Sequence, residues 1–204
     1  MSAGDGVWIG ADPGGEENFG VAVLLPDGTG HTRCTSYADE AVDAVCQWLD
    51  GSPAGVGVDA PLWWSSGVAG RRFADQWLRD TYELPSNRVQ AVNSLWGAAL
   101  VQGEMFVLRI RERFPGVSVT ETHPKALLVA LSMPEGEAFW ERFTVDWSAA
   151  ERPEHERDAL ISAVAAREGF GGRWPCDLSQ RRYPSEQDPS ESWLGPVHYF
   201  WPPQ

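Results

Sequence analysis

Four acidic residues stand at positions from which a sheet protein could gather them into one site. Asp12 ends an apolar run, Asp59 interrupts another, and Glu121 closes a segment of alternating polar and apolar residues. Asp158 falls in the second turn of a helical segment and is followed by three apolar residues, so we expect it to face the core. An α/β sheet presents its strand ends along one edge. The spacing therefore predicts that these carboxylates converge.

Carboxylates gathered in this way could bind divalent metal ions. Mg²⁺ prefers hard oxygen ligands, and two ions about 3.5–4 Å apart need several anionic oxygens, one of which bridges both. We expect Asp12 to bridge two Mg²⁺ or Mn²⁺ ions and Asp59 and Asp158 to hold one each. One ion would lower the pKa of an attacking water, and the other would stabilise charge on a leaving 3′ oxygen.

Each acid also has a purely structural interpretation. Asp12 begins an Asp-Pro-Gly turn, and Asp59 could cap the turn that follows its strand. Glu121 precedes a helical segment, and Asp158 could pair with His155, which lies three residues earlier on the same helix face. One such acid alone predicts little. The metal-site hypothesis depends on the four together.

Basic and aromatic residues near the second acid are candidates for binding a substrate. Four arginines follow it and could grip a phosphate backbone: Arg71, Arg72, Arg79 and Arg88. Arg72, Asp75 and Arg79 are also spaced as an ordinary salt-bridged helix face. Trp63 and Trp64 could stack on a base, or they could pack within their own loop.

Apolar periodicity predicts the elements that must position these side chains. Strands are expected at residues 7–11, 19–25, 30–37, 56–60 and 117–122. Helices are expected at residues 38–49, 69–82, 94–114, 124–131, 135–143 and 153–168. This order predicts an α/β fold whose mixed sheet combines a three-stranded antiparallel meander with parallel strands, flanked by helices. We expect one domain over residues 1–170 and an extended tail over 171–204, packed on that domain.

Composition excludes several classes of protein. The chain has 204 residues and a formal charge of −13, and Lys125 is its only lysine, so a general DNA-coating protein is excluded. No apolar run approaches the roughly 20 residues of a membrane span, and residues 1–6 lack the pattern of a signal peptide. Three widely spaced cysteines predict no disulfide framework. A cytoplasmic protein without a membrane partner is expected.

Four short motifs carry a resemblance to a known family. They are G-A-D-P-G-G at 10–15, G-V-D-A-P-L at 57–62, E-T-H-P at 121–124 and H-E-R-D-A-L-I-S-A at 155–163. They look like the motifs of RNase H-like folds, and RuvC-type Holliday-junction resolvases show a similar first-strand Asp-Pro-Gly and last-helix His-x-x-Asp-Ala. Together, over residues 10–166, they most resemble a family of predicted RNase H-like nucleases of unknown function.

The resemblance implies an RNase H-like fold and a Mg²⁺- or Mn²⁺-dependent nuclease acting on nucleic acid. It implies an acidic catalytic site with two histidines nearby, made of Asp12, Asp59, Glu121, Asp158, His155 and His123. His123, Arg71, Arg72 and Arg79 are expected on the substrate side, and the type of nucleic acid is left open.

Two other classes of function remain open. A catalytically silent binding protein could keep the fold and its acids for structural reasons, and Lys125 and the negative charge favour it. A phosphotransferase of the actin and sugar-kinase type also opens with a strand, an acid and a glycine turn. That fold needs two such domains, however, and this chain has room for one and carries no second glycine-rich phosphate loop.

Overall fold

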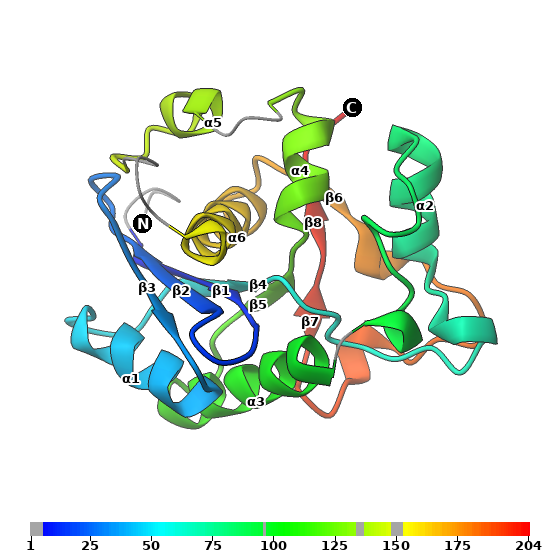
Figure 1. Ribbon diagram of the computed structural model, residues 1–204, viewed down its shortest axis with the longest axis horizontal. Coiled ribbons are helices and arrows are strands. Elements are labelled where there is room, and N and C mark those ends of the chain that lie inside the picture. The colour runs from blue at the N-terminus through cyan, green and yellow to red at the C-terminus, as the bar shows by residue number, and fades with distance from the viewer. Residues whose placement is uncertain (1–5, 96, 134–136, 148–152) are drawn as a thin grey trace.

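A six-stranded mixed sheet forms the centre of the computed structural model, which describes residues 6–95, 97–133, 137–147 and 153–204 (Figure 1). In spatial order its strands are β3 (Gly30–Thr35), β2 (Phe19–Leu24), β1 (Trp8–Asp12), β4 (Gly55–Val58), β5 (Val119–Glu121) and β7 (Val197–His198). The first three pair antiparallel, and β4, β5 and β7 continue the sheet in parallel from β1. The predicted α/β class, with a meander followed by parallel strands and flanking helices, is confirmed.

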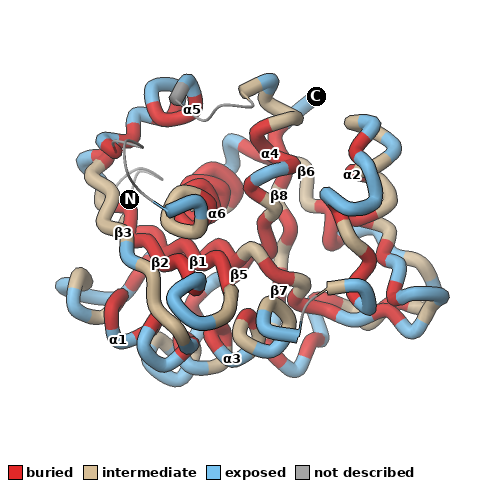
Figure 2. Tube along the Cα trace, in the orientation of Figure 1, coloured by how far each residue is buried: buried red, intermediate tan, exposed pale blue. Residues whose placement is uncertain are grey.

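Helices cover both faces of this sheet. Two of them, α1 (Ala38–Gln47) and α3 (Gly97–Arg113), pack together on one face, and α6 (Glu154–Phe170) lies across the other. Beside α6 lies α4 (Pro124–Ala130), while α5 (Glu137–Arg142) and α2 (Phe73–Tyr82) lie further out. Strands β1, β2, β4 and β5 are buried throughout and, with the buried part of α6, form the centre of the molecule (Figure 2).

Glycines allow α6 to lie directly on the backbone of the sheet. Gly10, Gly20 and Gly57 belong to β1, β2 and β4, and a Cβ atom at any of them would overlap a backbone carbonyl of α6. The carbonyls concerned belong to Ala159, His155 and Ser162, respectively. Any larger residue at these three positions would push the helix away from the strands. The sequence thus fixes how closely α6 approaches the strand ends.

Helix α2 begins later than its apolar periodicity predicts. The expected helix spans 69–82, but Ala69 has a φ of +58° within the short 3₁₀ turn η1 (Val68–Gly70), and Arg72 is extended with a φ of −107°. The α-helix starts at Phe73. At this point the side chain of Arg72 leaves the line of the helix and binds two buried carboxylates, those of Asp75 and Glu121. The prediction of a helix starting at residue 69 is therefore wrong.

The last part of the chain both lies on the domain and extends its sheet. It contains β7, the antiparallel pair β6 (Cys176–Asp177) and β8 (Phe200–Trp201), and the 3₁₀ turns η3 (Leu178–Gln180) and η4 (Pro189–Glu191). A further 3₁₀ turn, η2 (Val92–Ser94), precedes α3. In the described part of the chain, no helix is both long and apolar enough to cross a membrane.

Asp177 ties this C-terminal segment together. Its carboxylate accepts hydrogen bonds from Tyr199 N at 2.9 Å and from Ser179 Oγ at 2.7 Å, and it lies 2.9 Å from His198 Nδ1. Burial alone would raise the pKa of Asp177, but these bonds outweigh it and lower the pKa to about 2. Asp177 is therefore ionised at neutral pH, where it caps the turn η3 and ties it to the end of β7.

Candidate metal centre

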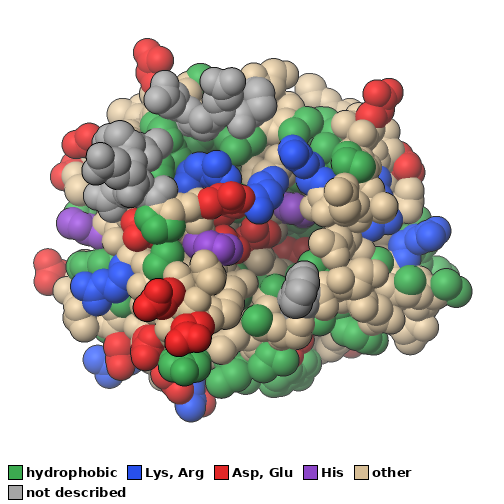
Figure 3. All heavy atoms as spheres, in the orientation of Figure 1, with side chains coloured by type: hydrophobic (Ala, Val, Ile, Leu, Met, Phe, Trp, Pro, Cys, Tyr) green, Lys and Arg blue, Asp and Glu red, His purple; other side chains and the backbone are tan. Residues whose placement is uncertain are grey.

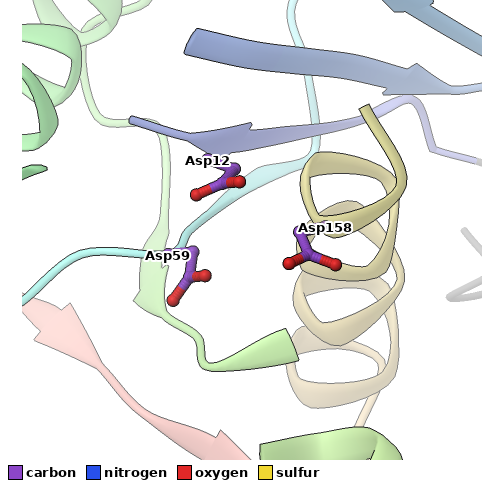
Figure 4. Close-up of side chains that lie close together, drawn as sticks. All are labelled: Asp12, Asp59 and Asp158. Carbon is purple, nitrogen blue, oxygen red and sulfur yellow. The ribbon is translucent and has the colours of Figure 1, made fainter. Parts of the chain in front are cut away.

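Asp12, Asp59 and Asp158 converge at the edge of the sheet (Figure 4). Asp12 is the last residue of β1, Asp59 directly follows β4, and Asp158 projects from α6 toward both. Each contributes a carboxylate oxygen that lies within 4.8 Å of an oxygen of the other two. Because β1 and β4 are parallel neighbours, their carboxyl ends meet at the same edge. The predicted convergence of these three acids is confirmed.

Two of these acids, Asp12 and Asp59, line a cavity of about 480 Å³. Figure 3 shows it as a hollow on this face, rimmed by acidic, basic and histidine side chains. His123 and Lys125 also line it. The connection between α2 and α3 contributes further lining residues, including Asn87, Arg88 and Gln90. A ligand in the cavity would therefore lie directly beside the carboxylates.

Burial and the charges of neighbouring acids disfavour the ionised forms of Asp59 and Asp158. Burial, followed by the charges of Asp12 and Asp158, raises the pKa of Asp59 well above its usual range. Asp158 is only 1% exposed, and burial raises its pKa to about 6 although the charge of Arg157 opposes the shift. A divalent cation among these oxygens would relieve both effects, because it stabilises the ionised carboxylates.

Two basic side chains of α6 each bind one carboxylate oxygen of the acids. His155 Nδ1 lies 2.6 Å from Asp12 Oδ2, and this hydrogen bond raises the pKa of His155. Arg157 Nε donates to Asp158 Oδ1 at 2.8 Å. His155 reaches Asp12 because Gly20, paired with Asp12 across the sheet, leaves room for the backbone of α6. The sequence suggested Asp158 as the partner of His155, but in the structure His155 binds Asp12.

Glu121 lies beside the three aspartates but is held by Arg72. Arg72 Nη1 donates to Oε2 of Glu121 at 2.7 Å, Nη2 donates to Oε1 at 2.6 Å, and the backbone N–H of Leu62 donates to Oε2 at 3.0 Å. Arg72 also binds Asp75 through Nε and Nη2, at 2.9 and 2.7 Å. Only 1% of Arg72 is exposed, so it is not free to grip a substrate as its sequence position suggested. Asp75 completes this network, and sequence spacing linked it only to the arginines.

The remaining substrate candidates lie in different places. Arg79 Nε donates to Val89 O at 2.6 Å, which commits it to the α2–α3 connection, and Arg71 is exposed. Arg88 is exposed and lines the cavity. Trp63 is buried over the guanidinium of Arg72, whereas Trp64 is 46% exposed. Of these arginines, Arg88 is the exposed one that lines the same cavity as Asp12 and Asp59.

His123 supplies a neutral nitrogen beside the acids. Burial lowers its pKa to about 4, so it is uncharged at neutral pH. Its Nδ1 atom is buried, has no hydrogen-bond partner among the described residues, and lies 4.0 Å from Asp59 Oδ1. Buried polar atoms usually have a partner, so this orientation favours a polar ligand in the cavity.

Comparisons with protein-family models, with curated proteins and with solved structures found no match to this chain. The resemblance of its four motifs to RNase H-like nucleases therefore remains a hypothesis.

Sequence reasoning missed the roles of Arg157 and Lys125 at the site. Their positions in the sequence were the signal that could have indicated these roles. Arg157 stands directly before Asp158, and Lys125 stands two residues after His123.

Proposed function

We propose that this chain is a metal-dependent phosphodiester hydrolase with an RNase H-like fold, which cleaves nucleic acid in the cytoplasm. The convergence of Asp12, Asp59 and Asp158 within 4.8 Å carries the proposal. Three carboxylates at one sheet edge match the oxygen donors that Mg²⁺ and Mn²⁺ take, with water and phosphate completing the shell. The motif resemblance supports the same fold and activity. Cys34, Cys46 and Cys176 are free thiols, which favours a reducing compartment.

The reaction would be the addition of water to a phosphodiester. The water oxygen forms a new bond to phosphorus, the bond to the 3′ oxygen breaks, and that oxygen leaves as an alcohol carrying one of the water's protons. A divalent ion supplies Lewis acidity when bound. Asp12 and Asp59 would hold it from the strand ends and Asp158 from α6. His155 would keep Asp12 in position through its 2.6 Å contact.

Cleavage of a labelled oligonucleotide panel by the metal-stripped chain tests the proposal. We expect hydrolysis with Mn²⁺ or Mg²⁺, poor activity with Ca²⁺ because its larger shell positions water loosely, and no activity in excess EDTA. Asp59→Asn should abolish cleavage. Asp39→Asn is the matched control, because Asp39 lies on α1 at the opposite face of the sheet. Full cleavage in EDTA would contradict the mechanism.

A second function deserves the same test. Arg157 and Lys125 already lie 2.7 and 3.9 Å from Asp158, and this favours a binding protein in which cations of the chain take the place of metal. Such a protein would bind oligonucleotides without cleaving them and would bind Mn²⁺ weakly. ATP turnover by the metal-loaded chain would instead support the phosphotransferase alternative.

A further inference from the structure

Lys125 stands against the same acids that a metal ion would use. Its ammonium nitrogen lies 2.6 Å from Glu154 Oε1 and 3.9 Å from Asp158 Oδ2, and the residue lines the cavity beside Asp12 and Asp59. The side chain is 48% exposed, so its head can turn toward a ligand in the cavity. Its ammonium group is thus paired with two carboxylates of α6. It is a cation at neutral pH.

Few carboxylate oxygens remain for a pair of ions. Arg157 engages one oxygen of Asp158, and His155 engages one oxygen of Asp12. Both oxygens of Glu121, the fourth acid, are bound to an arginine. Two ions about 3.5–4 Å apart would need a bridging carboxylate and further ligands for each ion. The third aspartate and one oxygen on each of the other two suit a single ion that completes its shell with water.

We propose that the centre binds one divalent ion and that Lys125 supplies the second positive charge, facing the substrate phosphate from α4. This inference rests on the proposed metal-dependent hydrolysis and replaces the two-ion arrangement expected from the sequence. An ammonium group binds phosphate oxygens as a compact point charge and needs no carboxylate ligands of its own. Lys125 can therefore take the place of the second ion, for which too few carboxylate oxygens remain.

The test is the binding of Mn²⁺ to the metal-stripped full chain, followed by calorimetry and electron paramagnetic resonance. The wild-type chain should bind one Mn²⁺ and show no Mn²⁺–Mn²⁺ coupling. Lys125→Gln should still bind one, about tenfold more tightly, because a positive charge beside the ligands is removed. Lys125→Glu adds a carboxylate at this position and should bind a second, coupled Mn²⁺.

Arg109→Gln is the matched control. It also removes one positive charge, but Arg109 lies on α3 at the opposite face of the sheet and pairs there with Asp39 and Glu112. Its Mn²⁺ stoichiometry and affinity should equal those of the wild-type chain. Lys125 is about half exposed, so its variants should fold, and melting curves will verify that.

Cleavage provides an independent readout of the same variants. Lys125→Gln should cleave at least about tenfold more slowly while it binds Mn²⁺ more tightly, whereas a merely structural lysine would change both in the same direction. The inference is overturned if the wild-type chain binds two coupled ions, if Lys125→Gln fails to tighten Mn²⁺ binding, or if Lys125→Glu still binds only one ion. No Mn²⁺ binding by the wild-type chain would overturn the proposed hydrolase function itself.

Discussion

Replacing Arg72 by methionine removes the cation from the network that borders the acid cluster. Arg72 makes four hydrogen bonds of 2.6–2.9 Å to Glu121 and Asp75, and none of the three residues is more than 3% exposed. Methionine keeps an unbranched apolar chain beneath the ring of Trp63, which lies 4.3 Å from the guanidinium carbon. Two buried carboxylates would then lack their cation. Removing one partner of a buried ion pair costs about 3–5 kcal/mol.

We therefore expect Arg72→Met to lower the free energy of unfolding by about 4 kcal/mol. In a chain of 204 residues this corresponds to a melting temperature roughly 8–16 °C lower, since each kcal/mol shifts it by about 2–4 °C. Urea titration followed by tryptophan fluorescence would measure the change, and an unchanged slope would show that the variant unfolds from the same compact state.

The double variant Arg72→Met/Glu121→Gln separates lost packing from the unpaired charge. An amide at position 121 needs no cation, so the double variant should recover roughly 1–2 kcal/mol relative to Arg72→Met alone. If the free energy of unfolding of Arg72→Met lies within about 1 kcal/mol of that of the wild-type chain, the network does not stabilise the fold as described above. Glu121 would then again be a candidate catalytic acid.

Three further substitutions have definite expected signs. Asp158→Asn should stabilise the metal-free chain by about 2–3 kcal/mol at pH 7.5 and not at pH 4. The pKa of Asp158 in the folded state is about 6, so the wild-type chain loses stability as the pH rises from about 4 to 6. A melting temperature in EDTA at pH 7.5 that is lower for the variant than for the wild-type chain would contradict this. Asp177→Asn should cost about 2 kcal/mol at neutral pH, because the pKa of about 2 gives the wild-type chain stability that it loses as the pH falls from about 4 to 2. A difference in melting temperature between variant and wild-type chain that is the same at pH 7 and at pH 2 would refute it. Gly10→Ala should cost at least about 3 kcal/mol in urea titrations, whereas Gly15→Ala, whose Cβ would meet open space, should be close to neutral.

The sequence predicted the parts of the site that depend on local pattern. Asp12 and Asp59 each stand at the end of a short apolar run, and such runs between turn residues form buried strands whose ends share one edge. The phase of a helix placed Asp158 against the core. These three positions needed no knowledge of long-range packing beyond parallel pairing of the strands.

Long-range pairing could not be predicted in the same way. Arg72 meets Glu121 across 49 residues of sequence, and His155 meets Asp12 across 143. Both contacts depend on the course of the loops between the elements. The composition of those loops is compatible with many conformations, so it does not predict that course. The two-residue strand β7 is likewise too short for an alternating pattern, and it pairs with the sheet only because β5 offers an open edge.

The packing of α6 on Gly10, Gly20 and Gly57 has a consequence for the synthesis of the chain on the ribosome. A growing chain emerges from the ribosome N-terminus first, so two of the three aspartates are available long before Asp158 is made. The third comes with α6, whose carbonyls pack directly against the bare glycine backbone of the strands. The acid cluster is thus completed only when α6, which carries Asp158, has been synthesised and has packed on the sheet.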